Sequence, residues 1–227
     1  MRSSGRAAFF DVDETVIKAK SMFDFLRFWL DTRGDDGTAY ERAMSDIKTM
    51  AADDVPRSEI NRSYYRLYTG SSYDELLTAG RAWYAAYRTG SAAFVKATVR
   101  AVEVHRAAGD SVGLVSGSFP ACLRPLAEDL GADVVLCTEP VVGDGGLLTG
   151  EVVTPMIGAA KASAVAATIS GWGFSAAECF GYGDHATDLD MLSVVGNPRA
   201  VEGDPVLVRH ARARGWPILS AQTGPLH

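Results

Sequence analysis

The sequence predicts an α/β protein with a parallel sheet, interrupted after its first strand by an all-helical insert. Short apolar segments alternate with helical segments over residues 91–227, as is typical of a parallel sheet covered by helices on both faces. Residues 19–90 instead contain four successive helical segments with no strand between them. We therefore predict a Rossmann-like α/β core formed by residues 1–18 and 91–227, and a helical cap formed by residues 19–90.

The composition is that of a globular protein. The 227 residues are 47% hydrophobic, enough for one large core and a small second unit. The net charge of −6 argues against nonspecific nucleic-acid binding, which needs a basic face. The N-terminal residues lack the apolar segment of a signal peptide, and no apolar stretch reaches membrane-spanning length. We therefore expect a cytoplasmic protein that binds neither nucleic acid nor membrane, with its three widely spaced cysteines reduced.

The first strand is predicted from apolar residues 7–10, which lead directly into Asp11 and Asp13. The run is too short for a helix and is followed by polar turn residues. Ligands bind at the carboxyl ends of strands in open α/β sheets, so the two carboxylates stand where a ligand would lie. Their negative charges repel unless a cation or a shared proton compensates them. The alternative is that Asp13 only caps a following helix.

The insert is predicted from helix-start signals. Ser21 can cap the first helix, and Pro56 stands where a helix start tolerates proline. Ser72 and Glu75 have the spacing of a capping box. The four predicted helices cover residues 21–30, 40–52, 57–68 and 73–88.

The rest of the core follows the alternating pattern. Gly143–Gly146 separates two extended pieces and predicts a hairpin over residues 141–153. Gly109 is a favoured residue after a helix C-terminus. The other predicted helices cover residues 94–108, 120 onward, 161–169 and 188–194, and the other strands cover residues 111–115, 134–136, 178–182 and 217–219.

Carboxylates follow two of these strands. Asp11 and Asp13 follow the first, and Asp184, with Asp188 four residues later, follows the strand over residues 178–182. Because parallel strands end at one edge of a sheet, we expect these side chains to lie together. Several hard oxygen ligands suit Mg2+, which takes one or two carboxylates together with water and phosphate oxygens.

A hydroxyl group and an ammonium group are predicted to lie beside these carboxylates. Ser116 and Gly117 follow another strand and precede a helix, where a hydroxyl and backbone N–H groups can bind an anion. Lys161 starts a helix and can neutralise charge on a phosphoryl group or on an attacking carboxylate. Together these groups predict phosphoryl transfer.

Four segments resemble the motifs of the haloacid dehalogenase (HAD) superfamily in order and spacing: Asp11–Thr15, Ser116–Ser118, Lys161 and Gly183–Asp188. The helical insert resembles the type C1 cap of subfamily IB, the phosphoserine-phosphatase-like group. The resemblance implies the HAD fold and extends over nearly the whole chain.

The resemblance implies a division of roles at the first motif. Asp11 would attack phosphorus and form an aspartyl-phosphate. Asp13 would protonate the leaving alcohol and then deprotonate the attacking water. Asp11, the backbone carbonyl of Asp13, and Asp184 would hold Mg2+ as the cofactor.

The resemblance also implies a phosphate grip formed by Ser116, the Gly117 amide and Lys161. Asp188 would orient the metal ligands or Lys161, and Thr15 would help to close the turn after the first strand. Simpler readings stay open: Ser116 and Asp188 are also suited to cap helices, and Lys161 to be a solvated lysine. Lys18 and Lys96 are the rival lysines.

The cap should set the choice of substrate, a small-molecule phosphate ester. The position at which phosphoserine phosphatases carry a glutamate that pairs with the substrate amine is here Lys20, of opposite sign. A cation there would repel an ammonium and attract a carboxylate or second phosphate, which disfavours phosphoserine. Arg62 is the other expected substrate contact. Further candidates facing the site are Met22, Phe23, Tyr65 and Arg66, although apolar members of this set are also explained as core of the cap.

The sequence thus predicts a Mg2+-dependent phosphatase that hydrolyses a small-metabolite phosphomonoester. Two alternatives stay open: a phosphotransferase or mutase that passes the phosphoryl group to another alcohol, and a catalytically idle phosphometabolite-binding protein. The intact set of Asp11, Asp13, Lys161 and Asp184 argues against the idle protein, because binding alone needs no acid at position 13. An aromatic-rich cap is also compatible with a homodimer.

Overall fold

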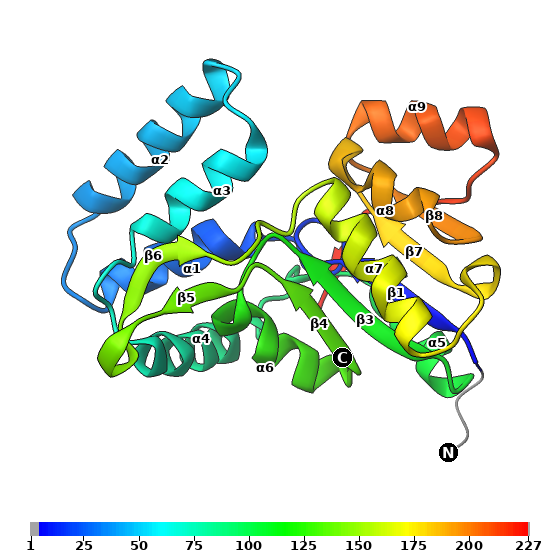
Figure 1. The fold of residues 1–227 in the computed structure, drawn as a ribbon, viewed down its shortest axis with the longest axis horizontal. Helices are drawn as coiled ribbons and strands as arrows, with labels where there is room; N and C mark the ends of the chain where they lie inside the picture. Colours follow the sequence, from blue (N-terminus) through cyan, green and yellow to red (C-terminus); the bar gives the residue numbers. More distant parts are fainter. Residues whose placement is uncertain (1–4, 227) are drawn as a thin grey trace.

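The computed structural model describes residues 5–226 and contains a six-stranded parallel sheet in the order β4-β3-β1-β7-β8-β9. Figure 1 shows the sheet with the helical insert to one side. All five strand pairs are parallel, so the carboxyl ends of the strands meet at one edge. The α/β prediction is confirmed. The strands are β1 (Ala7–Asp11), β3 (Ser111–Ser116), β4 (Val134–Cys137), β7 (Phe180–Gly183), β8 (Asn197–Val201) and β9 (Ile218–Leu219).

Helices cover both faces of the sheet. Phe9 and Phe10 show the alternation of β1, because successive side chains of a strand point to opposite faces. Phe10 belongs to the apolar cluster that includes α5 and α6, whereas Phe9 belongs to the cluster that includes α7, α8 and α9. These helices are α5 (Lys96–Ala107), α6 (Pro120–Leu130), α7 (Ala159–Gly171), α8 (Leu189–Ser193) and α9 (Pro205–Arg214).

The insert between β1 and β2 (Phe94–Val95) consists of four helices. They are α1 (Ser21–Asp31), α2 (Thr38–Ala52), α3 (Arg57–Arg66) and α4 (Tyr73–Tyr87). Phe119, at the start of α6, packs its ring against Phe25, Tyr65 and Tyr68 of the insert, with ring centroids 5.5–5.8 Å apart. The aromatic core of the insert is therefore continuous with the core under the sheet.

Helix α4 lies directly against α6. A Cβ atom at Gly80 of α4 would lie 1.9 Å from the carbonyl oxygen of Ala121, so only glycine permits this approach. Ser21 is buried in the same contact region, and its hydroxyl donates a hydrogen bond of 2.8 Å to that of Ser118. The insert is thus fixed to the α/β part by close backbone packing as well as by aromatic rings.

A hairpin from the α/β part extends to the insert. Its strands are β5 (Pro140–Val142) and β6 (Leu148–Val152), joined through the short 3-10 turn Asp144–Gly146, at the glycine-rich segment that the sequence indicated. In Figure 1 the hairpin runs beneath α3. Leu148 accepts a hydrogen bond from the Gly70 amide at 2.8 Å and donates one to Ser71 at 2.9 Å. The segment 91–227 therefore contributes two strands to the surroundings of the insert.

The two chain segments that connect the insert to the sheet lie side by side. The Lys18 amide donates to the Ala93 carbonyl at 2.8 Å, and the Val95 amide donates to the Val16 carbonyl at 2.9 Å. Strand β2 also pairs in antiparallel fashion with β10 (Thr223–Gly224). Both connections are consequently held in one hydrogen-bonded ribbon.

Several predicted details were wrong. The N-cap of α1 is Lys20, and Ser21 is the first helical residue, because its hydroxyl bonds to Ser118 instead of to the helix end. The helix predicted from residue 94 begins at Lys96, since Phe94 and Val95 form β2.

Strand β8 and helix α9 were not predicted from the sequence. Strand β8 begins with Asn197 and Pro198, and proline weakens the signal of a strand. The start of α9 did carry a signal, since Asp204 caps it by accepting from the Val206 amide and Pro205 is its first residue.

Candidate active site

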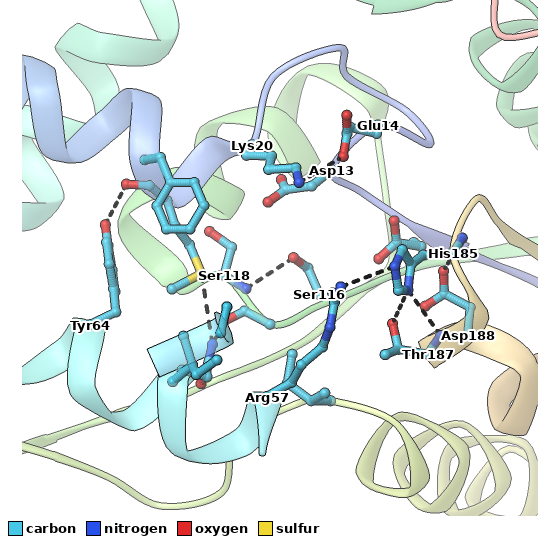
Figure 2. Close-up of a pocket in the computed structure, with 18 of the residues that line it drawn as sticks. Asp13, Glu14, Lys20, Arg57, Tyr64, Ser116, Ser118, His185, Thr187 and Asp188 are labelled. Atoms are coloured by element: carbon cyan, nitrogen blue, oxygen red, sulfur yellow. Dashed lines mark hydrogen bonds and ion pairs between the residues drawn. The ribbon is translucent and has the colours of Figure 1, made fainter. Parts of the chain in front are cut away.

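A cavity of about 540 Å³ lies between the carboxyl edge of the sheet and the insert. Figure 2 shows polar side chains from the sheet on one side of it and α3 on the other. Most of the residues singled out from the sequence line it: Asp11, Asp13, Lys20, Met22, Phe23, Ser116, Gly117, Lys161, Asp184 and Asp188. The fold therefore brings together groups that are up to 177 positions apart in the chain, as Asp11 and Asp188 are.

Lys161 connects two carboxylates at the base of the cavity. Its Nζ lies 2.5 Å from Oδ1 of Asp11 and 2.7 Å from Oδ1 of Asp188, and only 4% of the residue is exposed. Burial opposes the charged form, but the two carboxylates outweigh it and raise the pKa of the Lys161 ammonium above its ordinary value. The rival lysines, Lys18 and Lys96, are exposed and do not line the cavity.

Asp188 is buried between β7 and α8. Its Oδ2 accepts a hydrogen bond of 3.3 Å from the His185 amide, while its Oδ1 holds Lys161. It stands at the N-cap position of α8 without a side-chain bond to that helix. A Cβ atom at Gly183 would lie 2.7 Å from that of Asp188, so glycine at the end of β7 leaves room for this carboxylate.

Asp184 is oriented by the turn that follows β1. The Thr15 hydroxyl donates to Oδ1 of Asp184 at 2.9 Å, and the Thr15 carbonyl in turn accepts from the Thr98 hydroxyl at 2.6 Å. Burial and the nearby charge of Asp188 raise the pKa of Asp184 to about 6, against the opposing effect of the Thr15 bond. Thr15, which does not itself line the cavity, thus orients the Asp184 carboxylate.

The carboxylates form a cluster suited to a divalent cation. Asp11, Asp184 and Asp188 are buried and offer oxygen atoms that all lie within 4.8 Å of one another. With Lys161 as their neighbouring ammonium, three ionised carboxylates leave a formal charge of −2. Hard oxygen ligands with this excess charge fit Mg2+. The cluster includes Asp188, whereas the family pattern assigns the third ligand to the backbone of Asp13.

Asp13 faces the same cavity from the turn after β1. Its Oδ1 is buried and has no hydrogen-bond partner among residues 5–226. Burial raises the pKa of Asp13 to about 6, while bonds from Ser21 and the charge of Lys161 oppose the rise. Helix capping does not explain this residue, since the N-cap of α1 is Lys20. An unpaired carboxyl oxygen with a raised pKa is suited to proton transfer.

The loop after β3 is held by the insert. Two buried side chains of α3, Asn61 and Tyr65, each donate a hydrogen bond of 2.9 Å to the Gly117 carbonyl. The Ser116 hydroxyl accepts from the Ser118 amide at 3.0 Å, and the N-cap of α6 is Phe119. The loop that carries the predicted phosphate-binding groups is therefore positioned from the insert side.

A family model for haloacid dehalogenase-like hydrolases matches residues 8–193. The chain belongs to this HAD family. It is a hydrolase by that membership, and each of the four motif segments contributes a residue to the cavity just described.

Known relatives of this HAD hydrolase carry different names. The "Inhibition of morphological differentiation protein" of Streptomyces azureus is 46% identical over 118 residues, which span 52% of this chain but only 43% of that relative. "Phosphoserine phosphatase SerB1" of Mycobacterium tuberculosis is 29% identical over 219 residues, 93% of this chain and 70% of the relative. A solved structure from Bordetella pertussis Tohama I, described as a protein with unknown function, has a TM-score of 0.84, 25% identity and coverage of 95% and 98%.

An ion pair and a hydrogen bond stand at the exposed rim of the HAD cavity (Figure 2). Lys20 lies 3.3 Å from Glu14, and the two side chains are 57% and 40% exposed. Arg57 lies 3.1 Å from Nε2 of His185. Burial and the Arg57 charge lower the pKa of His185, so the neutral ring is favoured. Lys20 is therefore a cation with a partner, not an isolated charge.

The structure does not bring Arg62 to the cavity. Its guanidinium lies against the Val152 carbonyl at 3.3 Å and Glu59 at 3.5 Å, and Arg66 pairs with Glu151. Sequence reasoning missed Arg57 and Asn61, which do line the cavity. Residues three or four apart share a helix face, so Arg57, Asn61 and Tyr64 form the inner face of α3, and that spacing was the available signal.

The insert side of the cavity is mainly apolar. Lining residues of this kind come from α1, α2, α3 and the α2–α3 connection, with one more from the loop before α7. They are Met22, Phe23, Ile47, Ala51, Val55, Ile60, Tyr64 and Ile157.

No helix within residues 5–226 is long and apolar enough to cross a lipid bilayer.

Proposed function

We propose that this HAD hydrolase is a Mg2+-dependent phosphatase that cleaves a small-metabolite phosphomonoester through an aspartyl-phosphate. One observation carries the proposal: Asp11, held by Lys161, shares a cavity with Asp13, whose buried oxygen has no partner within the described chain. Binding a phosphate ester requires no second acid, whereas cleaving one does. This contrast favours catalysis over an idle binding protein.

In the first half of the proposed reaction, a carboxylate oxygen of Asp11 attacks phosphorus and forms the aspartyl-phosphate. The bond between phosphorus and the ester oxygen breaks, and Asp13 gives its proton to that oxygen. With a pKa of about 6, Asp13 can carry a proton near neutral pH and still lose it readily. The leaving alcohol departs neutral.

In the second half, Asp13 accepts a proton from water as the water oxygen bonds to phosphorus. The bond between phosphorus and Asp11 breaks, which releases inorganic phosphate and restores the carboxylate. Lys161, the Ser116 hydroxyl and the Gly117 amide are proposed to hold the phosphoryl oxygens during both halves. The bonds from Asn61 and Tyr65 keep the Gly117 peptide in one orientation.

The buried carboxylates would hold the cation. Asp11 and Asp184 are proposed as its side-chain ligands, with the backbone carbonyl of Asp13 as a third, while Asp188 keeps Lys161 in place. When bound, Mg2+ supplies positive charge that stabilises the negative phosphoryl group in the transition state. Thr15 fixes the orientation of Asp184.

Residues 19–90 are proposed to act as the cap that selects the substrate. Phosphoserine is disfavoured, because Lys20 presents a cation where an amine-binding site needs a carboxylate. Glu14 is a carboxylate that partly neutralises Lys20, so an approaching ammonium group would meet the ion pair rather than an isolated lysine. The M. tuberculosis relative named phosphoserine phosphatase makes this compound a necessary comparison in any assay.

Substitution of the nucleophile tests the proposal. Asp11→Asn should reduce turnover of acetyl phosphate with Mg2+ by about 10³-fold or more, because an amide cannot form the aspartyl-phosphate. Asp190→Asn, at an exposed position that does not line the cavity, should leave turnover unchanged. Full activity of Asp11→Asn would refute the mechanism. Phosphorylation of an added alcohol in place of phosphate release would instead identify a phosphotransferase.

A further inference from the structure

The cavity has two chemically different ends. The sheet end carries the carboxylates and Lys161, where the phosphoryl group would lie. The opposite wall is formed by apolar side chains of the insert, including Ile47, Ala51, Val55 and Ile60. If the phosphoryl group occupies the polar end, the part of a substrate nearest to it faces this apolar wall, while the charged rim lies farther out.

The polar side chains within that wall are already engaged. Asn61 donates to the Gly117 carbonyl, and its Oδ1 accepts from the Thr138 hydroxyl at 3.3 Å. The Tyr64 hydroxyl bonds to the Met22 carbonyl at 2.5 Å and to the Tyr68 hydroxyl at 2.6 Å. A polar leaving group placed here would lose its water and gain no equivalent partner, which is unfavourable.

The charged residues contributed by the insert stand at the rim. Lys20, Asp54 and Arg57 line the cavity, but each is exposed. Lys20 is paired with Glu14, and Arg57 contacts the His185 ring. A small zwitterion bound within reach of Asp11 would therefore find no charged partner on the inner insert wall, and Lys20 at the rim would repel its ammonium group.

We propose that the substrates are phosphate monoesters of apolar alcohols, with the hydrocarbon seated against the wall formed by α1, α2 and α3. The inference rests on the proposed phosphatase function and specifies its substrate class. A cavity of about 540 Å³ is within the range that holds compact organic ligands. Each methylene moved from water to such a wall is worth roughly a fourfold gain in binding.

A series of matched substrates tests this class. Ethyl, isobutyl and 2-phenylethyl phosphate all release primary alcohols, so their intrinsic reactivities are similar. With Mg2+, kcat/KM should rise roughly fourfold per added methylene until the wall is filled. Phosphoserine, phosphoethanolamine and glycerol 3-phosphate should remain at or below ethyl phosphate. A kcat/KM for any of these polar esters that equals or exceeds that of 2-phenylethyl phosphate would overturn the inference.

A wall variant separates contact with the hydrocarbon from general effects. Val55→Asn should lower the preference for 2-phenylethyl over ethyl phosphate by several-fold, since it places an amide on the wall. Val153→Asn is the control, because Val153 is 69% exposed and does not line the cavity. An unchanged preference in Val55→Asn would count against the proposed wall.

Two further readouts keep the inference and the proposed function distinguishable. Alkylphosphonates cannot be hydrolysed, so their inhibition constants report wall contact without turnover and should fall along the same alkyl series. Acetyl phosphate has almost no hydrocarbon and reports catalysis alone. Turnover of acetyl phosphate without any alkyl preference would overturn only the substrate class. Absence of turnover with every ester would overturn the phosphatase function and the substrate class together.

Discussion

The two sides of the cavity differ in how their polar groups are used. On the sheet side, buried charged groups face the cavity: Lys161 bridges two carboxylates, and Asp13 keeps an unpaired oxygen. On the insert side, the buried polar groups Asn61 and Tyr64 are occupied by hydrogen bonds, and mostly hydrocarbon is presented. The difference supports the proposal that the reacting groups belong to the sheet and that the insert selects among leaving groups.

The largest expected effect comes from breaking the charge balance on the sheet side. Lys161→Met leaves Asp11 and Asp188 buried without their cation, which should lower the free energy of unfolding by about 3–5 kcal/mol. Urea denaturation in EDTA measures this loss. Lys18→Met removes an exposed ammonium and should change stability by less than about 0.5 kcal/mol. Similar values for the two variants would contradict the ion-pair account.

The next effect tests how the two sides are joined. Gly80→Ala places a Cβ atom against the Ala121 carbonyl, so α4 must move away from α6, at a cost of about 1–3 kcal/mol. Gly171→Ala is a matched control at the end of α7, where nothing lies within 4 Å, and it should be neutral or stabilising. Thermal unfolding of both variants measures the two changes in stability. Loss of stability in Gly171→Ala but not in Gly80→Ala would refute the close packing of α4 on α6.

A smaller effect is expected where the insert contacts the loop after β3, which is proposed to bind the phosphoryl group. Tyr65→Phe removes one of two donors to the Gly117 carbonyl and should cost about 0.5–1.5 kcal/mol of stability. It should also lower kcat/KM, since the loop is then held by Asn61 alone. Tyr73→Phe, outside the cavity, serves as the control. If the two substitutions reduce kcat/KM equally, the loop is not positioned by α3.

The smallest effect distinguishes Arg57 from Arg62, two of the three arginines of α3. Arg62 lies outside the cavity, so Arg62→Ala should change kcat/KM by less than about twofold. Arg57→Ala removes a cation from the rim and should have the greater effect on KM. A larger change for Arg62→Ala would restore the contact that the sequence suggested.

The sequence was more informative about the sheet than about the insert. Asp11 and Ser116 are each the last residue of a strand, so recognising the strand also places the side chain. Parallel pairing then puts strand ends at a common edge, whatever their separation in the chain. Strand β8 was not predicted, because short strands that contain proline show little of the hydrophobic pattern by which strands are recognised.

The inner face of the insert depends on packing that the sequence pattern does not reveal. Helix α3 turns Tyr65 onto Phe119 and Gly117, and this orientation brings Arg57 to the cavity while it turns Arg62 toward the hairpin. Helical periodicity identifies which residues share a face, but not which face meets the cavity. The choice between the two arginines was therefore made by tertiary contacts.

The paired connections between sheet and insert restrict how the cavity can open. Because the segments around Lys18 and Val95 are hydrogen-bonded to Ala93 and Val16, they bend together as one ribbon. A two-stranded ribbon bends easily across its face and resists bending in its own plane. Because α4 and Phe119 also hold the insert against the α/β part, the ribbon should permit only small movements of the insert, and an entering ester and the departing alcohol should use the same opening, one after the other.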